Sequence, residues 1–402
     1  MLKSLTVENF RSFRKPVQIS LELNGHAPTD ELSFVSSATG VRASKCLAVI
    51  GANASGKTNI LHALGFLHWF MVFSFTQSMP DDSIPLVPHF SSTDKPSSFE
   101  VEFEYDGKTW RYNLSILKER VLHESLHVRH PDKRRFSYIF VRDWNDGTQS
   151  YTVKQDRQRF DFFSKEAIRV RQNASMISSA AQYGVELAIK LVSMNLRYNF
   201  SYEGRENVEP HSITRVSQFY AKTKNEKILN WMTSLLTEWD LGLSDIQIET
   251  APTPTLGKAP RQTFVPFGIH RVNGQEHKLM LNHESNGTQS AFILLACLLP
   301  VLLDGGLAVI DELEANLHPR MLPVILDLFL SPETNPNNAQ IIFTTHSLEI
   351  LNSLHKSQIV IVEKNEHCES DAWNLNSVTG IRADDNLYAK YMAGAYGGVP
   401  RI

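Results

Sequence analysis

Hydrophobic and polar residues alternate in several short stretches of the chain. The alternation is clear in LKSLTVENF and VQISLEL near the start, and in FEVEFEY and TWRYNLSI, which flank Asp106 and Gly107. A two-residue period is typical of half-buried strands, and an Asp-Gly pair between two such stretches predicts a tight hairpin turn. CLAVI, LAVI and QIIF are short and wholly apolar, which indicates buried strands. The pattern therefore predicts a β-rich N-terminal region and further buried strands along the chain.

Helical spacing of apolar residues dominates residues 161–240, and the apolar run AFILLACLLPVLL at 291–303 predicts a buried helix too short to cross a bilayer. Between them, TAPTPTLGKAP at 250–260 is rich in Pro and Thr and predicts a linker. We therefore expect an α/β fold with three parts. They are an N-terminal lobe with a β-hairpin arm (1–160), a helical insertion (161–250) and a C-terminal lobe of strands and helices (251–402).

Composition narrows the class of protein further. Of 402 residues, 42% are hydrophobic and 21% are charged, as in ordinary globular proteins, and the net charge of -3 excludes a uniformly basic nucleic-acid-binding surface. Cys46, Cys297 and Cys368 are far apart, so we expect neither a disulfide framework nor a cysteine zinc site. The first residues, MLKSLTVENFRSF, lack the apolar core of a signal peptide. We expect a cytoplasmic protein without a membrane segment.

The apolar stretch CLAVI leads directly into the motif GANASGKT at 51–58. A glycine, four residues and then Gly-Lys-Thr, placed between a strand and a helix, is the spacing of a P-loop. In such a loop, successive N–H groups surround phosphates, Lys57 adds a positive charge and the Thr58 hydroxyl binds Mg²⁺. The predicted nucleotide-binding residues are Asn53, Ala54, Ser55, Gly56, Lys57, Thr58 and Asn59.

Polar residues follow two of the apolar strands. LAVI at 307–310 ends in Asp311 and Glu312, and QIIF at 340–343 is followed by TTHS, which contains His346. A carboxylate at a strand end can bind Mg²⁺, and a second one can polarise the attacking water. We assign the metal to Asp311 and the water to Glu312, and expect His346 to contact the γ-phosphate or the water. In isolation, each motif would pass for a solvent-exposed strand end.

The segment ESNGT at 284–288 precedes the long apolar helix. Ser285 and Gly287 would present a hydroxyl and free N–H groups to an anion, as a second phosphate-binding surface. The alternative is an ordinary capped helix with Ser285 as its N-cap. The order of P-loop, insertion, Ser-x-Gly helix and Asp-Glu strand resembles that of ATP-binding-cassette (ABC) ATPases. In those proteins this signature segment caps the nucleotide held by a second subunit.

More closely, the chain resembles bacterial ABC-type ATPases grouped under the AAA name, the RloA-like and abortive-infection L-type proteins, and their relatives RecF, SMC and the zinc-hook repair ATPase. LTVENFRSF, ESNGT, IDELEANLHP, TTHS and the terminal NLYAKYMAGAYGGVPRI all fit this resemblance. EANLHP (314–319) matches the D-loop, and Phe10 to Phe13 fall where such heads contact the adenine side of the nucleotide. The signature departs from the transporters' Leu-Ser-Gly-Gly-Gln, and Gln77 is the one candidate for a Q-loop. The insertion lacks the heptads and Cys-x-x-Cys hook of the repair ATPase.

The resemblance implies an ABC-type P-loop head that binds ATP and Mg²⁺ and hydrolyses ATP at sites shared in a head-to-tail dimer or higher oligomer. It also implies a partner effector, such as a nuclease or toxin, and a role in anti-phage defence. Two alternatives remain open at this point. One is a RecF-like ATPase of DNA repair or recombination, and the other is a scaffold that ATP locks around a toxin or nuclease.

Two further segments carry charged or metal-binding residue types. HESLH, His123 to His127, satisfies a zinc-peptidase pattern, but its flanks predict a strand, where residues four apart lie about 13 Å from each other. We therefore expect no zinc there. A basic strip interleaved with aromatics could contact nucleic acid, or it could be a solvated face or a protein-docking surface. Its residues are Arg129, Lys133, Arg134, Arg135, Arg142, Arg157, Arg159, Arg169 and Arg171.

Overall fold

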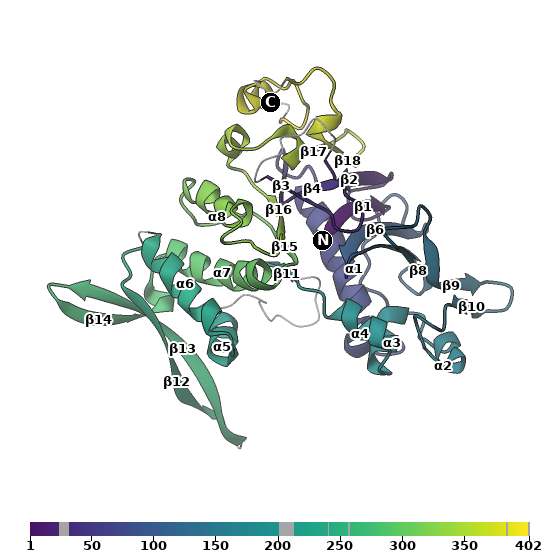
Figure 1. The fold of residues 1–402 in the computed structure, drawn as a ribbon, viewed down its shortest axis with the longest axis horizontal. Helices are drawn as coiled ribbons and strands as arrows, with labels where there is room; N and C mark the ends of the chain where they lie inside the picture. The colour runs from purple at the N-terminus through teal and green to yellow at the C-terminus, as the bar shows by residue number, and fades with distance from the viewer. Residues whose placement is uncertain (24–31, 201–212, 240, 256–257, 383–384, 401–402) are drawn as a thin grey trace.

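The computed structural model describes residues 1–23, 32–200, 213–239, 241–255, 258–382 and 385–400. Its body contains two large β-sheets with a long helix between them (Figure 1). The first sheet is antiparallel, in the order β10-β9-β8-β7-β6-β1-β2. Its strands are β1 (Leu2–Glu8), β2 (Val17–Ser20), β6 (Ser97–Tyr105), β7 (Lys108–Ile116), β8 (Val121–Arg129), β9 (Ser137–Asn145) and β10 (Ser150–Gln155).

The alternating pattern predicted these strands correctly. In β6, every second residue from Ser97 to Phe103 is buried, as expected for a sheet with one covered face. The predicted hairpin turn is confirmed, because Tyr105 pairs with Lys108 and the two residues between them have positive φ, 52° at Asp106 and 64° at Gly107. Such a turn matches the twist of the flanking strands.

The second sheet has the order β11-β15-β16-β5-β17-β18. The first five strands are parallel and β18 is antiparallel. The apolar stretches form its central strands, which are buried along almost their whole length because both faces are covered. The strands are β5 (Cys46–Gly51), β11 (Leu196–Tyr198), β15 (Leu307–Ile310), β16 (Gln340–Thr344), β17 (Ile359–Lys364) and β18 (Ser370–Asn374). The predicted α/β fold class is confirmed.

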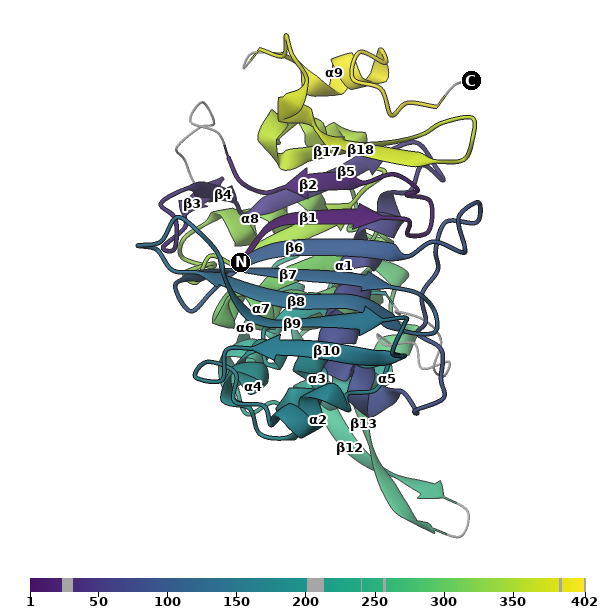
Figure 2. The same cartoon turned by 90° about the vertical axis from the view of Figure 1, so that its right-hand side faces the viewer.

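Two hydrophobic cores lie on opposite faces of this second sheet. Leu47 and Val49 of β5 pack with α1 (Lys57–Gln77) and the antiparallel sheet, whereas Ala48 and Ile50 pack with α7 (Asn286–Asp304) and α8 (Met321–Leu330). Figure 2 shows the antiparallel sheet with α1 behind it. The strand that leads into the P-loop is therefore fixed from both sides.

Helices α1 and α7 are long and apolar enough, by length and composition alone, to cross a membrane. Our expectation that the apolar run at 291–303 is too short was wrong, because α7 extends over 19 residues. Within the described residues, 61% of each apolar window is buried inside the protein. Both helices serve as core helices of this fold.

Residues 161–240 contain mainly short helices, which pack on two different parts of the body. Helix α3 packs against α1, and α5 and α6 pack against α7. The helices are α2 (Ser164–Ile168), α3 (Met176–Gln182), α4 (Glu186–Val192), α5 (Ile213–Lys222) and α6 (Glu226–Glu238). The remaining elements outside the projecting arm are β3 (Ser33–Val35), β4 (Arg42–Ser44), α9 (Leu387–Met392) and the 3₁₀ turns Leu281–His283, Leu348–Asn352, Lys356–Gln358 and Leu375–Ser377.

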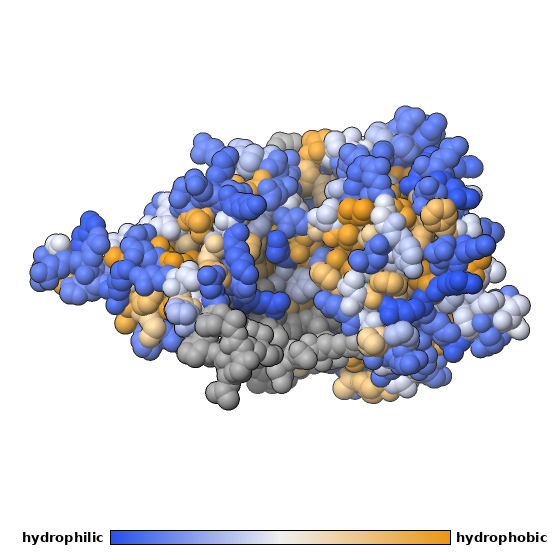
Figure 3. Space-filling view, turned by 90° about the horizontal axis from the view of Figure 1, so that it is seen from below, coloured by the Kyte–Doolittle hydropathy of each residue, from blue (hydrophilic) through white to orange (hydrophobic). Residues whose placement is uncertain are grey.

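A three-stranded arm projects from the body, formed by β12 (Asp245–Thr255), β13 (Lys258–Val272) and β14 (Gln275–Met280). The predicted linker at 250–260 is therefore wrong, since most of it forms β12 and β13. Strand β12 lies at the edge of the sheet order β12-β13-β14, where a proline such as Pro252 is tolerated because it need not donate to a neighbour. Polar side chains cover much of the projecting end of the molecule (Figure 3), including the ion-paired Arg271 and Glu276.

The basic strip does not form one continuous surface. Arg142 is fully buried, where it donates to the carbonyls of Val170 and Ala174 at 2.8 and 2.9 Å and lies 3.5 Å from Glu124 Oε2. Half-buried Arg171 donates to the carbonyls of Phe75 and Ser78. Including these two arginines in a nucleic-acid surface was wrong, because their guanidinium groups bind backbone carbonyls inside the fold.

Glu124, the second residue of HESLH, is also fully buried. It accepts hydrogen bonds from Tyr112 Oη at 2.9 Å and Ser175 Oγ at 2.7 Å. The segment is part of strand β8, as predicted, and His123 Nδ1 lies 2.7 Å from Asp143 Oδ1. The Glu124–Arg142 pair therefore joins the antiparallel sheet to the start of α3.

We expect Arg142→Ala to lower the free energy of unfolding by about 3–5 kcal/mol, because it leaves the Glu124 carboxylate buried without its cation. Arg159→Ala is the matched control, since Arg159 is 42% exposed and pairs with Asp156 at the surface. The control should cost less than about 1 kcal/mol. Urea unfolding followed by circular dichroism measures both, and equal midpoints for the two variants would contradict this role.

Candidate nucleotide site

The P-loop connects β5 to α1. Both of its glycines are needed, because neighbouring atoms leave no room for a side chain at either position. A Cβ atom at Gly51 would lie 2.2 Å from the carbonyl oxygen of Val362 in the adjacent strand β17. Gly56 has a φ of 114°, and a Cβ there would lie 2.6 Å from Ser370 Oγ and 2.7 Å from Ser12 Oγ. Only glycine fits at these two positions, so the loop conformation depends on them.

Lys57 is buried, and its ammonium group lies inside the loop. Nζ donates to the carbonyls of Gly51 and Ala52 at 2.9 and 3.0 Å. Burial lowers the pKa of Lys57, while the nearby carboxylates, Asp311 foremost, act in the opposite direction. A cation held by neutral carbonyls has a stronger partner in a phosphate oxygen, because opposite charges attract each other.

Asp311 is the centre of the hydrogen bonds beside the loop. Its Oδ1 accepts from Thr58 Oγ1 at 3.0 Å and from Thr344 Oγ1 at 2.6 Å. The backbone N–H of Asp311 donates to Asn199 Oδ1 at 2.7 Å, and the Asp311 carbonyl accepts from Asn199 Nδ2 at 2.8 Å. Asn199 was not predicted, because it lies far from Asp311 in sequence and no motif marks it. Thr344 was noted only as the start of TTHS.

Thr58 and Asp311 fit a magnesium ion. Two ligands at right angles around Mg²⁺, each about 2.1 Å from the ion, lie about 3.0 Å apart. The Thr58 Oγ1 and Asp311 Oδ1 atoms are 3.0 Å apart, and both are the hard oxygen ligands that Mg²⁺ prefers. Since these two side chains supply few ligands, phosphate oxygens and water would complete the shell.

Glu312 and His346 lie together beside this centre. His346 Nε2 is 3.6 Å from Glu312 Oε1, and the two side chains are 46% and 58% exposed. Glu312 has a φ of 49°, which is uncommon for a non-glycine residue, and its N–H donates to Thr344 Oγ1 at 2.7 Å. The backbone N–H of His346 donates to Glu314 Oε1. Thr344 therefore positions both Asp311 and Glu312.

Two serines outside the predicted motif residues contact the P-loop. Ser370 Oγ is 2.7 Å from Ser12 Oγ and 2.5 Å from the carbonyl oxygen of Ser55, and Asn59 Nδ2 donates to Ser12 Oγ at 2.7 Å. The sequence could have indicated Ser12 as a site residue only by its position beside the phenylalanines of NFRSF. Ser370 lies more than 300 residues from the loop in sequence, and no pattern indicated its contact.

Phe10 and Phe13 do not lie where adenine could contact them. Both rings are fully buried, and Phe10 packs against Phe66 and Phe99. The expectation that this stretch contacts the adenine side was therefore wrong for its aromatic residues, which belong to the core around α1. Gln77 was also a wrong candidate for the Q-loop, because 20 residues of helix α1 place it about 30 Å from Lys57.

Ser285 is the N-cap of α7, and its Oγ accepts from the N–H of Thr288 at 3.1 Å. The residue is exposed. A Cβ at Gly287 would lie 3.1 Å from the carbonyl oxygen of Asn316, so the signature segment touches the EANLHP loop. Among the hydrogen bonds of the described residues, none joins Ser285 or Gly287 to the P-loop. Lys57, Thr58, Asp311, Glu312 and His346 thus lie together, whereas no hydrogen bond of the described residues links Ser285 or Gly287 to them.

We expect Gly56→Ala to destabilise the protein by about 2–5 kcal/mol, since it adds a steric clash to the penalty for positive φ. Gly184→Ala is the control, because Gly184 has a φ of 80° but a Cβ added there would meet no atom within 4 Å. The control should cost only about 1–2 kcal/mol. Chemical unfolding measures the difference, and equal losses would show that the contacts with Ser12 and Ser370 do not constrain the loop.

Three solved SMC head domains are similar to the chain at low identity. The SMC head bound to the C-winged helix domain of ScpA is 14% identical with a TM-score of 0.44, covering 94% of this chain and 99% of that one. The Thermotoga maritima head is 15% identical with a TM-score of 0.38, covering 93% and 98%. The Pyrococcus furiosus head with an extended coiled coil, bound to the C-terminal domain of ScpA, is 11% identical with a TM-score of 0.45, covering 94% and 97%.

Similarity in sequence is more informative. A stretch of 93 residues is 36% identical to the uncharacterized protein MJECL11 of Methanocaldococcus jannaschii, covering 23% of this chain and 79% of that protein. The family described as "AAA domain, putative AbiEii toxin, Type IV TA system" matches residues 46–352. This match spans the P-loop, the signature segment, Asp311, Glu312 and His346. The chain therefore belongs to this family of AAA-domain ATPases.

Proposed function

We propose that the protein binds ATP with Mg²⁺ and hydrolyses it at a site that a second copy of the chain completes. The observation that carries this proposal is the meeting of Lys57, Thr58, Asp311 and Thr344 at the carboxyl ends of the neighbouring parallel strands β5, β16 and β15. Ligands of open α/β sheets bind at that edge.

Residues 53–59 would surround the phosphates with backbone N–H groups, and Lys57 would exchange its carbonyl partners for phosphate oxygens. Thr58 and Asp311 would hold Mg²⁺. When bound, the ion supplies positive charge beside the phosphates. Ser12 and Ser370 maintain the shape of the loop, because their hydroxyls contact Asn59 and the Ser55 carbonyl.

Glu312 is the candidate general base. Its carboxylate is exposed and close enough to Lys57 to act on the pKa of that residue, and it can accept the proton of an attacking water. His346 lies close enough to Glu312 to bind the same water or to contact the γ-phosphate. The positive φ of Glu312 supports this role, since strained backbone concentrates at functional sites.

Ser285 and Gly287 support a shared site. They stand at the exposed start of the 19-residue helix α7, whose first N–H groups favour an anion. They make no hydrogen bond to the P-loop of their own chain within the described residues. A head-to-tail pair of chains would place each signature segment over the nucleotide of the other chain, and closed rings or higher oligomers follow the same rule.

We further propose that ATP turnover controls a partner effector, such as a nuclease or toxin, in cytoplasmic anti-phage defence. The family description names a toxin of a type IV toxin–antitoxin system, which supports a role in such conflict systems. A DNA-repair role has less support, because two residues of the basic strip, Arg142 and Arg171, are bound to internal carbonyls.

Glu312→Gln should keep ATP affinity and lower turnover about 10²–10⁴-fold, because the amide preserves size but cannot accept the proton. Calorimetry measures binding and phosphate release measures turnover. Glu186→Gln is the control, since Glu186 is exposed on α4 and pairs with Lys190. Wild-type turnover in Glu312→Gln would remove this residue from its proposed role.

A mixing experiment tests the shared site. Lys57→Ala and Ser285→Arg chains should each be inactive alone, whereas random pairing makes about half the dimers mixed, each with one intact site. About a quarter of wild-type activity should return. In the control, the Lys57→Ala chain is mixed with a Lys57→Ala/Ser285→Arg chain, which leaves no intact Lys57. No recovery in a mixture that sedimentation shows to be dimeric would contradict the shared site.

A further inference from the structure

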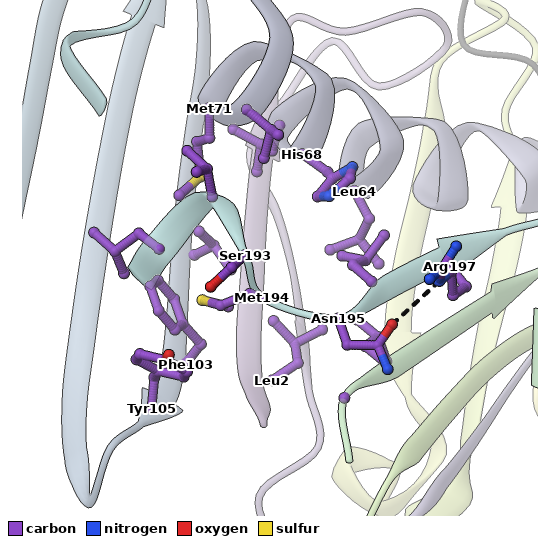
Figure 4. A pocket seen from close by; sticks show the side chains of 18 of the residues that line it. Leu2, Leu64, His68, Met71, Phe103, Tyr105, Ser193, Met194, Asn195 and Arg197 are labelled. Carbon is purple, nitrogen blue, oxygen red and sulfur yellow. Dashed lines mark hydrogen bonds between the residues drawn. The ribbon is translucent and has the colours of Figure 1, made fainter. Parts of the chain in front are cut away.

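A cavity of about 700 Å³ lies behind the P-loop helix (Figure 4). Its walls come from the middle of α1, from β6, from residues 191–197 before and within β11, and from residues 304–307 before and within β15. The first α1 residue in the wall is Leu64, seven positions after Lys57 and so about 10 Å along the helix. The cavity is thus separate from the nucleotide site.

Most of the wall is apolar. Leu64, Leu67 and Met71 line it from one face of α1, and Phe103 and Tyr105 line it from β6. The volume lies within the range of about 300–1,000 Å³ that is typical of small-molecule sites, which combine apolar walls with a few polar groups. An apolar body of one or two rings, or a short alkyl chain, would fit within this space.

One corner of the cavity is polar and incompletely bonded. The Nδ1 atom of His68 is shielded from solvent and has no hydrogen-bond partner among the described residues. Burial lowers the pKa of His68 to about 4, with a further contribution from the charge of Arg197, so the imidazole is neutral at pH 7. A buried nitrogen without a partner is unfavourable, and a ligand with a matching group would give it one.

Arg197 has donors available in this corner. Its Nε donates to Asn195 Oδ1 at 3.2 Å, the bond drawn in Figure 4, and within the described part of the chain its terminal nitrogens make no hydrogen bond. The amide nitrogen of Asn195 is already bound to the carbonyls of Pro300 and Gly305. Asp304 also lines the cavity but is not among the charges that act on His68. Because His68 is neutral, the positive charge on this side of the cavity comes from Arg197.

We propose that this cavity binds a small amphipathic anion. Its apolar body lies between α1 and β6, and its single carboxylate, sulfonate or phosphate group accepts hydrogen bonds from Arg197 and from His68. Arginine suits such a group because its terminal nitrogens can bind two oxygens at once.

The cavity also contacts three elements that position residues of the nucleotide site. Helix α1 begins at Lys57, β15 ends directly before Asp311, and β11 leads to Asn199, which binds the Asp311 backbone. A ligand in the cavity would therefore shift the ATP affinity of the site. This second step rests on the proposed function, whereas binding of the anion does not.

The test uses 8-anilinonaphthalene-1-sulfonate, an aromatic sulfonate whose fluorescence rises in apolar surroundings. Wild-type protein should bind it saturably at one site. Arg197→Gln should weaken binding about tenfold or more, since it removes a charge-assisted hydrogen bond. Met71→Trp should also weaken binding, because the larger side chain occupies part of the cavity. The controls are Arg169→Gln and Met79→Trp, whose side chains are exposed elsewhere and should leave binding unchanged.

No saturable binding, or equal binding by Arg197→Gln and Arg169→Gln, would overturn the proposed anion site. Arg197 is exposed, so its replacement keeps the test valid even where Met71→Trp fails to fold. Lys57→Ala should bind the sulfonate normally, which separates this result from a failure of the nucleotide proposal. ATP affinity that stays constant as wild-type protein is saturated with the sulfonate would overturn the second step alone.

Discussion

The hydrogen bonds that Asp311 Oδ1 accepts from Thr58 and Thr344 tie three elements together: the P-loop helix, β15 and β16. The three elements lie far apart in the sequence. Thr58, Asp311 and Thr344 meet only because parallel strands end at the same edge of the sheet. The two hydrophobic cores hold β5 from both faces, so this edge has a rigid base. The chemistry of the site depends on that arrangement.

Periodicity and motif spacing predicted those parts of the molecule in which the local sequence determines the structure. The Asp106-Gly107 hairpin is confirmed, since its turn is defined by two adjacent residues. The strands ending at Gly51 and Ile310 and the helix after Gly56 are also confirmed. For the same reason the sequence predicted that Lys57, Thr58, Asp311, Glu312 and His346 lie near one another. Asp311, Glu312 and His346 follow recognisable strands, and Lys57 and Thr58 begin the helix after another strand.

What could not be predicted depends on contacts between distant residues. From the sequence, Arg142 was predicted to be a surface charge. In the structure, Glu124 and the carbonyls of residues 170–174 surround it. The sequence near Phe10 does not show that this residue packs against α1. Asn199 and Ser370 belong to the site only through hydrogen bonds across more than 100 and 300 residues, respectively. Pro252 indicated a linker, because the sequence does not show that its strand lies at the edge of a sheet.

The site is divided between buried binding groups and exposed catalytic candidates. Lys57 is 6% exposed and Thr344 1%, whereas the side chains of Glu312 and His346 are 58% and 46% exposed. A general base acts best where bulk water is excluded, because charge interactions strengthen as the surroundings dry. Within the described residues, nothing from the same chain brings Ser285 or Gly287 over Glu312 by a hydrogen bond. The exposure of Glu312 and His346 and the exposed start of α7 therefore both support the proposal of a shared site, in which a second copy of the chain covers Glu312 and His346.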